Sequence, residues 1–202
     1  MVNDHGKYRP LSYFQLMEVS LRELLVEKGI VSEQEIAQEV EAMRNRGYER
    51  GSRVVAHAWL DPGFKARLLQ NGTQACEELG LEIPGLKLLV VENTREVHNA
   101  IVCTLCSCYP RVLLGIPPDW YKLRSYRSRM VREPRAVLEE FGLKIPDHVT
   151  IRVHDSTADM RYLVLPMRPP GTEGWTEERL ATLVNRDSMI GVALPLSATA
   201  RI

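Results

Sequence analysis

The sequence has no excess charge of either sign, because its 26 lysine and arginine residues balance 26 aspartate and glutamate residues. A neutral chain lacks the basic surface that binds nucleic acid or attracts an anionic membrane, so neither is an expected partner. No apolar run approaches the length that spans a bilayer. The polar residues 1–10 lack the apolar segment of a signal peptide, and we therefore expect a cytoplasmic protein.

Cysteine is scarce, and its distribution is uneven. The chain has four cysteines, and three of them fall within six residues, at Cys103, Cys106 and Cys108. Clustered cysteines favour a metal site or catalysis over a disulfide framework. The fourth, Cys76, lies in a helical pattern and is interpreted as a small buried hydrophobic residue.

The chain also lacks a nucleophile–histidine triad, a phosphate-binding loop and a nucleotide-binding fingerprint, so none of these sites is predicted.

The stretch from Cys103 to Cys108 carries the donor atoms of a planar chelate. The amide nitrogens of Ser107 and Cys108 lie between the sulfurs of Cys106 and Cys108, so these four atoms can bind one ion in a plane. Cys103 can add a third sulfur below that plane, which leaves a sixth position open. Neither Ser107 nor Cys108 is proline, so both amides can lose a proton.

The donor set also bears on the choice of ion. Zinc prefers a closed tetrahedron of thiolate and imidazole ligands, and geometry and ligand type decide between competing metals. Deprotonated amides are strong donors that suit low-spin trivalent iron or cobalt. An open position opposite a thiolate lets such an ion act as a Lewis acid. The residues alone therefore favour a trivalent metal with catalytic chemistry, either iron or cobalt.

The segment Cys103-Thr104-Leu105-Cys106-Ser107-Cys108 resembles the metal-binding motif of nitrile hydratase alpha subunits and of the related thiocyanate hydrolase gamma subunit. In that family, threonine after the first cysteine accompanies cobalt and serine accompanies iron. Thr104 therefore implies one non-corrin Co(III) ion per chain rather than Fe(III). The resemblance also implies that Cys103 stays a thiolate, Cys106 becomes a sulfinic acid and Cys108 becomes a sulfenic acid. It extends through the segments 52–62, 91–94, 97–99, 115–122, 126–129, 132–135, 155–156, 161–162 and 186–192.

The resemblance implies a catalytic subunit that hydrates a nitrile to the corresponding amide. Its metal-binding residues would be Cys103, Cys106, Ser107 and Cys108. The nucleophile would be the sulfenate oxygen of Cys108 or a water molecule that it activates, and the sequence does not choose between them. Cys106 and Ser107 would join Cys108 as catalytic residues, with the Ser107 hydroxyl bonded to an oxidised sulfur or to the metal-bound water. The alternative is that Ser107 is only a spacer.

The same resemblance implies partner proteins. Family members receive two arginines from a beta subunit that bind the oxidised sulfurs, and no motif in this sequence replaces them. A beta subunit is therefore expected, together with an activator that loads the metal. The short chain and Arg111 also fit a three-chain nitrile hydratase that takes a bulky nucleoside nitrile, which would add a third subunit.

Several positions bear on the surroundings of the metal. Asp155 and Arg161 match family positions that form hydrogen bonds behind the metal loop, although such a pair can also be a surface ion pair of little energetic value. Asp159 stands where the family usually has glutamate. Arg111 replaces the tryptophan usual in nitrile hydratases, as in the thiocyanate hydrolase gamma subunit, and Pro84 replaces a pocket-lining glutamine. These changes predict a substrate pocket that is larger or suited to a polar or anionic substrate, unless Arg111 contacts a partner subunit.

Three other functions stay open. Thiocyanate hydrolase would use the same metal for a different small substrate. A non-catalytic subunit stabilised by zinc would use the three cysteines with His98 as the fourth ligand. A redox-sensing thiol pair would need no metal.

Capping residues and apolar periodicity divide the chain into an arm and a body. Ser12 and the box Ser32-Glu33-Gln34-Glu35 begin two helices that end at Gly29 and near Gly47. Their narrow apolar seams predict an extended helical arm over residues 1–50, which by the resemblance contacts a partner subunit. The alternative is that the arm folds back on the body. Residues 51–202 are expected to form the metal-binding catalytic domain.

The body alternates between helical and strand patterns. Apolar β-branched runs predict strands at 88–91 and 97–102, a hairpin of strands at 150–154 and 160–165, and a last strand at 188–194. This mixture indicates an α+β fold, and the resemblance implies a layered α-β-β-α domain of the nitrile hydratase alpha type. The metal loop follows a strand directly, where a scaffold can hold it rigidly. Helices are predicted at 52–60, 62–70, 73–79, after Pro117-Pro118, at 134–141 and at 176–185.

Overall fold

The computed structural model describes residues 11–45 and 47–199, and the polar residues 1–10 lie outside this range. The chain divides into two compact units, residues 1–45 and residues 46–202. The functional division into an arm of residues 1–50 and a catalytic domain of residues 51–202 stays a prediction. In the described part of the chain, no helix combines the length and apolarity that crossing a membrane requires.

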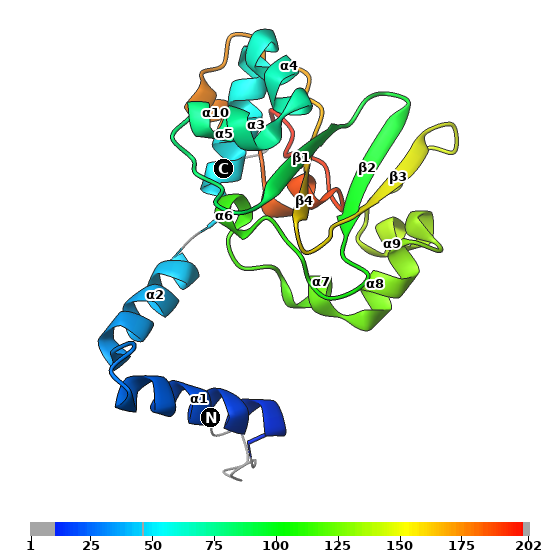
Figure 1. The fold of residues 1–202 in the computed structure, drawn as a ribbon. Helices are drawn as coiled ribbons and strands as arrows, with labels where there is room; N and C mark the ends of the chain where they lie inside the picture. Colours follow the sequence, from blue (N-terminus) through cyan, green and yellow to red (C-terminus); the bar gives the residue numbers. More distant parts are fainter. Residues whose placement is uncertain (1–10, 46, 200–202) are drawn as a thin grey trace. The chain divides into compact units, whose positions relative to one another are not determined.

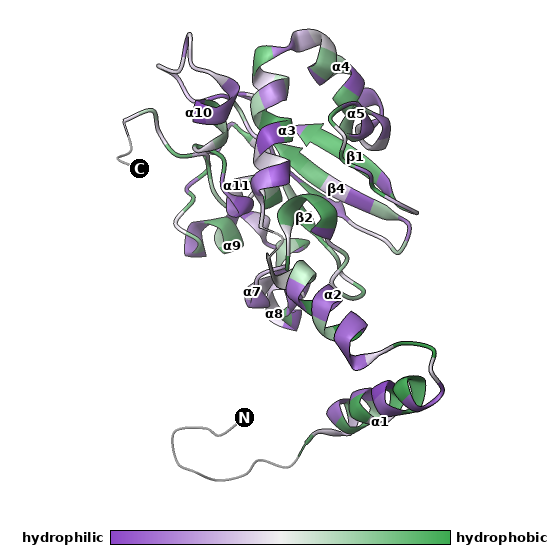
Figure 2. Cartoon of the chain, turned by 90° about the vertical axis from the view of Figure 1, so that its left-hand side faces the viewer, coloured by the Kyte–Doolittle hydropathy of each residue, from purple (hydrophilic) through white to green (hydrophobic). Residues whose placement is uncertain are grey.

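The first unit contains two helices, α1 (Tyr13–Glu27) and α2 (Glu33–Asn45), where the capping boxes predict them. Ser12 accepts a hydrogen bond from the amide of Gln15, and the side chain of Gln15 accepts one from the amide of Ser12. Most of the large apolar side chains of α1 are exposed, and none of its residues is buried. Figure 2 shows hydrophobic and hydrophilic residues interspersed along the same helix. The described part of this unit therefore contributes nothing to a buried core.

The second unit begins with three helices, α3 (Glu49–Leu60), α4 (Pro62–Gln70) and α5 (Gly72–Glu78), which agree with the predicted helices to within a few residues. Asp61 accepts hydrogen bonds from two amides in the first turn of α4, at 2.7 and 3.0 Å. Asn71 accepts one from the amide of Gln74 at 3.2 Å. Each cap satisfies amides that have no partner within the helix, which fixes where the helix begins.

Four strands form two separate parallel pairs, β1 (Lys87–Glu92) with β4 (Met160–Leu165) and β2 (Val97–Val102) with β3 (Thr150–Asp155). The four predicted strand positions are confirmed, but the predicted hairpin of β3 with β4 is wrong. Five of the six residues of β2 are buried, which is typical of a strand covered on both faces in a parallel arrangement. The pairing joins segments more than fifty positions apart, for which no local turn gives a signal.

The remaining helices are short: α6 (Arg111–Leu114), α7 (Asp119–Lys122), α8 (Arg124–Met130), α9 (Pro134–Glu140), α10 (Glu177–Ala181) and α11 (Arg186–Ile190). The predicted last strand at 188–194 is wrong, because its first residues belong to α11. Asn185 caps this helix on the amide of Ser188 at 2.8 Å. Gly191 ends it with a φ of 89°, and a Cβ there would lie 2.1 Å from the carbonyl oxygen of Asn99, so the close approach requires glycine.

Helices cover the strands on two sides, and the two strand pairs touch where β2 contacts β4. Helices α4 and α5 pack on β1, α11 packs on β4, and α9 packs on β3 (Figure 1). Apolar residues of the strands and helices meet in one core that includes Phe64, Leu88, Ile101 and Leu163, all at most 1% exposed. The α+β class and the layered arrangement predicted from the sequence are confirmed. The two strand pairs hold the loop that follows β2 at the edge of this core.

Candidate metal centre

Three sulfur atoms converge in the loop directly after β2, which spans residues Cys103–Cys108 and is called the claw below. The Sγ atoms of Cys103 and Cys106 lie 3.5 Å apart, and those of Cys106 and Cys108 lie 3.2 Å apart. All three lie within 4.8 Å of one another. Cys103 is buried, Cys108 is half-buried and Cys106 is exposed. The cluster can therefore offer three sulfur ligands to one ion from the edge of the core.

The thiols of Cys106 and Cys108 have pKa values shifted in opposite directions. Hydrogen bonds from the thiols of Cys108 and Cys103, and from the amide of Ser107, lower the pKa of Cys106 to about 7. Burial raises the pKa of Cys108, and the shared hydrogen bond with Cys106 adds to this, while the charge of Arg161 acts against it. A thiolate therefore forms at Cys106 before it forms at Cys108. Since metals bind thiolates, a proton must leave each remaining thiol when an ion enters.

Asp155 holds the first turn of the claw. Its carboxylate accepts a hydrogen bond from the amide of Thr104 at 2.9 Å and another from the Thr104 hydroxyl at 2.5 Å. Asp155 ends β3 and lies opposite Val102 in the strand register, so the parallel pairing delivers the carboxylate to the claw. The structure thus brings Asp155 behind the metal loop, as the sequence predicts, while its effect on a metal stays a prediction.

Arg161 lies beside the claw but does not pair with Asp155. Its Nη1 donates hydrogen bonds to the carbonyl oxygens of Thr157, Ala158 and Met160. These bonds hold the loop between β3 and β4 around the guanidinium. No ion pair joins Asp155 to Arg161 within the described residues, so the surface ion pair considered as an alternative is not formed. The buried Nε of Arg161 has no hydrogen-bond partner in the same part of the chain, which leaves one donor free beside Cys108.

Three further side chains bind the backbone of this region, and sequence reasoning missed their roles. The Tyr121 hydroxyl donates to the carbonyl oxygen of Cys108 at 2.9 Å, and the Tyr126 hydroxyl donates to that of Ile101 at 2.8 Å. Arg127 donates from Nη1 to the carbonyl oxygen of Thr104 at 3.1 Å. All three lie in α7 and α8, after the claw in sequence. The resemblance marked these segments as similar, but nothing in their spacing predicts which carbonyl each would bind.

The claw opens onto a small pocket. Its volume is about 340 Å³, at the lower end of the range typical of small-molecule sites. Arg111 and Arg161 both line it, so two positively charged residues belong to the pocket wall. Arg111 is therefore brought to the claw, whereas its contact with a substrate stays a prediction. The pocket is lined by Leu86, Cys106, Ser107, Cys108, Tyr109, Arg111, Val112 and Arg161.

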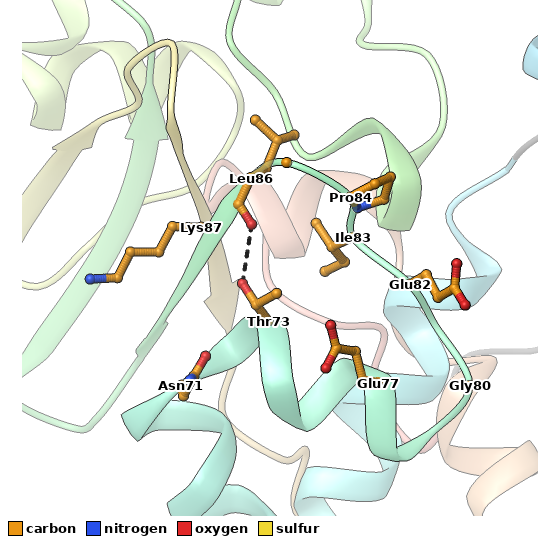
Figure 3. Close-up of a pocket in the computed structure, with 10 residues that line it drawn as sticks. Asn71, Thr73, Glu77, Gly80, Glu82, Ile83, Pro84, Leu86 and Lys87 are labelled. Carbon is orange, nitrogen blue, oxygen red and sulfur yellow. Dashed lines mark hydrogen bonds between the residues drawn. The ribbon is translucent and has the colours of Figure 1, made fainter.

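Pro84 lies elsewhere, in a larger hollow of about 920 Å³ that contains no cysteine. Figure 3 shows this hollow between α5 and the segment that leads into β1, with Thr73 and the carbonyl oxygen of Leu86 joined by a hydrogen bond. Leu86 borders both spaces, whereas Pro84 lines only the larger one. The structure thus does not bring Pro84 into the pocket at the claw, where the glutamine that it replaces was expected.

The zinc alternative needs His98 as its fourth ligand, and the structure engages this residue elsewhere. His98, the fourth ligand of the zinc alternative, precedes the claw by a whole strand, and its Nε2 lies 2.8 Å from the carbonyl oxygen of Gly191. Its Nδ1 lies 3.3 Å from the side-chain nitrogen of Asn93, so both ring nitrogens are already engaged. Among the described residues, the cluster of possible metal ligands consists of the three cysteines alone. A fourth and fifth protein ligand would then come from the backbone of the claw.

Comparisons with known proteins agree with this geometry. The nitrile hydratase alpha chain family model matches residues 12–193. The cobalt-containing nitrile hydratase subunit alpha of Pseudonocardia thermophila is 53% identical over 176 residues, which cover 86% of each chain. The thiocyanate hydrolase subunit gamma of Thiobacillus thioparus is 42% identical over 197 residues, which cover 92% of this chain and 81% of that one.

A solved structure shares the fold as well. A double mutant of the Fe-type nitrile hydratase from Comamonas testosteroni Ni1 superposes with a TM-score of 0.87 at 43% identity, covering 96% of each chain. The family match spans most of the sequence and includes the claw, both strand pairs and the segments that anchor them. The chain therefore belongs to the nitrile hydratase alpha chain family.

Proposed function

We propose that this chain is the metal-binding catalytic subunit of a cobalt nitrile hydratase, which hydrates a nitrile to the corresponding amide. The observation that carries the proposal is the convergence of three sulfurs within 4.8 Å in a chain 53% identical to a cobalt-containing nitrile hydratase alpha subunit. The reaction adds the oxygen of water to the nitrile carbon and protons to the nitrogen. A cytoplasmic location is part of the same proposal.

Cobalt is the ion that we assign to the claw, as one non-corrin Co(III) per chain. Cys103, Cys106 and Cys108 would bind it through sulfur, and Ser107 and Cys108 through their amide nitrogens. Bound there, it would supply a Lewis acid that polarises the nitrile. Thr104 supports cobalt over Fe(III) by resemblance, and its hydroxyl has a defined place on Asp155.

The remaining steps belong to side chains of the claw. Cys106 is proposed to be oxidised to a sulfinic acid and Cys108 to a sulfenic acid, in line with the exposure of Cys106 and the half-exposure of Cys108. The sulfenate oxygen of Cys108 would attack the nitrile carbon or take a proton from the attacking water. The Ser107 hydroxyl would donate a hydrogen bond to that oxygen, and Arg161 would offset its negative charge.

A beta subunit is proposed to complete the site. The relatives that match this chain carry the names of alpha and gamma subunits, which supports a multi-subunit assembly. Leu105, at the tip of the claw, is 84% exposed in this chain. The arm over residues 1–50 would contact the same assembly, and an activator would load the metal. If the substrate is a bulky nucleoside nitrile, the assembly would contain a third chain as well.

Thiocyanate hydrolysis is the second candidate, and one observation favours it. Arg111 and Arg161 both border the pocket at the claw, and two guanidinium groups suit an anion such as thiocyanate better than a neutral nitrile.

Product analysis separates the two candidates. The chain, co-expressed with its partner subunits in cobalt-supplemented cells, is offered a small nitrile, a bulky heteroaromatic nitrile and thiocyanate in parallel. Amide from a nitrile is the expected result, with two added oxygens on Cys106 and one on Cys108 in the intact mass. Carbonyl sulfide and ammonia from thiocyanate, with both nitriles inert, would replace the proposal with the second candidate. Stoichiometric zinc without added oxygen would reject both.

A further inference from the structure

A second pocket lies at the opposite end of β2 from the claw. Strands β2 and β3 run parallel (Figure 1), so the loops that lead into them meet at one edge while the claw follows the other. The entering loops, residues 93–98 and 143–149, border a hollow of about 620 Å³. This volume lies within the range of about 300–1,000 Å³ that is typical of small-molecule sites.

The pocket walls are mainly apolar. Leu143, Ile145 and Val149 are buried, and Met167 and Leu194 are 45% and 53% exposed beside them. Four prolines restrict the backbone around the same space, because proline fixes φ. An apolar wall on rigid backbone can accept the hydrocarbon part of a ligand with little loss of conformational entropy. The four prolines are Pro146, Pro169, Pro170 and Pro195.

Every residue with a permanent charge that lines the pocket is basic. Arg95 and Lys144 are exposed, and neither has a hydrogen-bond or ion-pair partner among the described residues. Arg168 is held in place by a hydrogen bond from Nε to the Thr172 hydroxyl at 2.9 Å. No aspartate or glutamate of the described chain lines this pocket. The acidic neighbours Glu96 and Asp147 belong to the entering loops but lie outside the lining.

A rigid polar network lies next to this space. His98 is 4% exposed and Asn93 is likewise 4% exposed, and the two side chains face each other at 3.3 Å. The Asn93 side-chain oxygen accepts hydrogen bonds from the amide and the side chain of Asn99, at 2.7 and 3.0 Å. Both side chains therefore have their polar atoms engaged. The groups left to bind a charged ligand are Arg95 and Lys144.

We propose that this pocket binds a small organic carboxylate with an apolar body. The body packs against Leu143, Ile145 and Leu194, and the carboxylate pairs with Arg95 and Lys144. A negative ligand is favoured because the lining holds unpaired cations and no competing carboxylate, so charge complementarity selects the sign. The site is remote from the sulfurs and does not depend on nitrile hydration.

Phenylacetate and phenylacetamide test the proposal, since they have nearly the same shape and differ in charge. The full-length chain, labelled with nitrogen-15, is titrated with each while the backbone amide resonances are followed. Phenylacetate should shift amides of residues 93–98 and 143–149, and phenylacetamide should bind about tenfold more weakly. The double variant Arg95→Gln/Lys144→Gln should lose about tenfold in affinity for phenylacetate. Lys87→Gln, which removes an exposed cation from the hollow in Figure 3, serves as the matched control and should bind normally.

A second pair of variants probes the apolar wall. Leu194→Asp places a carboxylate in the pocket and should abolish phenylacetate binding, whereas Leu194→Asn should retain part of it. Equal affinity for phenylacetate and phenylacetamide would overturn the anion site. Normal binding by the Arg95/Lys144 double variant, or shifts confined to residues 103–112, would place the ligand elsewhere and also overturn the proposal.

Discussion

The hydroxyl of Tyr121 donates a hydrogen bond of 2.9 Å to the carbonyl oxygen of Cys108. The tyrosine is fully buried, and its ring lies 5.1 Å from that of Tyr109, the residue after the claw. The bond fixes the peptide unit that follows Cys108, so the claw ends in one defined orientation. Tyr126 and Arg127 bind carbonyl oxygens before and within the claw in the same way. The claw backbone is thus held at both ends by side chains from α7 and α8.

Removing the Tyr121 hydroxyl should destabilise the chain and loosen the claw. Tyr121→Phe leaves the buried carbonyl of Cys108 without this partner, and we expect a loss of about 1 kcal/mol in the free energy of unfolding. Urea denaturation and cobalt content of the purified chain measure the two effects. The control is Tyr109→Phe, because the buried Tyr109 hydroxyl has no hydrogen-bond partner among the described residues. Equal losses in both variants would show that the bond to Cys108 has no special role.

Asp155 should affect the metal through Thr104. Asp155→Asn replaces one of the two accepting oxygens with a donor, which faces either the amide or the hydroxyl of Thr104. Side chains that orient a metal-binding loop typically change affinity by about 10–100-fold, and we expect a loss of this size for cobalt. A chelator competition assay measures it. Asp159→Asn alters an exposed carboxylate that accepts no hydrogen bond from the described residues, and a similar loss there would contradict the assignment.

Stability should fall as the pH drops below the ordinary histidine pKa of 6.5, in part because of His98. Burial lowers the pKa of His98 in the folded chain, so between pH 6.5 and that lower pKa the unfolded chain binds a proton that the folded chain does not. The stability that this histidine contributes is fully present above pH 6.5 and is lost as the pH falls. The slope for one proton is about 1.4 kcal/mol per pH unit.

Urea denaturation between pH 5 and 7.5 checks this dependence. His98→Gln removes the titrating ring and should flatten the profile, although the loss of the bond to Gly191 lowers stability throughout. Burial also lowers the pKa of His154, so part of the slope should persist. His148→Gln alters an exposed ring and is the matched control. An unchanged slope in His98→Gln would contradict the prediction.

Arg111 should influence which substrate is accepted. Arg111→Trp replaces a cation at the claw pocket with an aromatic wall, and we expect kcat/KM for a small nitrile to rise about tenfold relative to a bulky one. Competition between the two nitriles in the assembled enzyme measures the ratio directly. Arg124→Trp makes the same exchange at an exposed residue outside the pocket. If Arg111→Trp left the substrate profile unchanged, Arg111 would not contact the substrate.

The convergence of the three sulfurs could be predicted from the sequence because the claw is a local structure. Cys103, Cys106 and Cys108 need only the few peptide bonds between them to bring their sulfurs together, and the structure places them within 4.8 Å. Helix starts were predictable for the same reason, since Ser12, Asp61 and Asn71 each bind amides two or three residues ahead. The strand positions followed from apolar β-branched runs.

What surrounds the claw was decided only by tertiary structure. Because β3 and β4 are close in sequence, they were predicted to pair as a hairpin. Each of them instead pairs with a strand far away in the sequence. The run after Ser188 was predicted as a strand, because a short apolar run does not reveal its period, but the cap at Asn185 together with Gly191 makes its first residues helical.

The same distinction applies to the side chains that hold the claw. Asp155 reaches Thr104 across 51 positions because β3 lies beside β2, and Tyr121 reaches Cys108 because α7 packs under the loop. Local chemistry fixed the positions of the three sulfurs, since their geometry depends on neighbouring peptide bonds. Long-range packing fixed their orientation and the pockets at both ends of β2, because those depend on which distant segments bury one another's apolar surface.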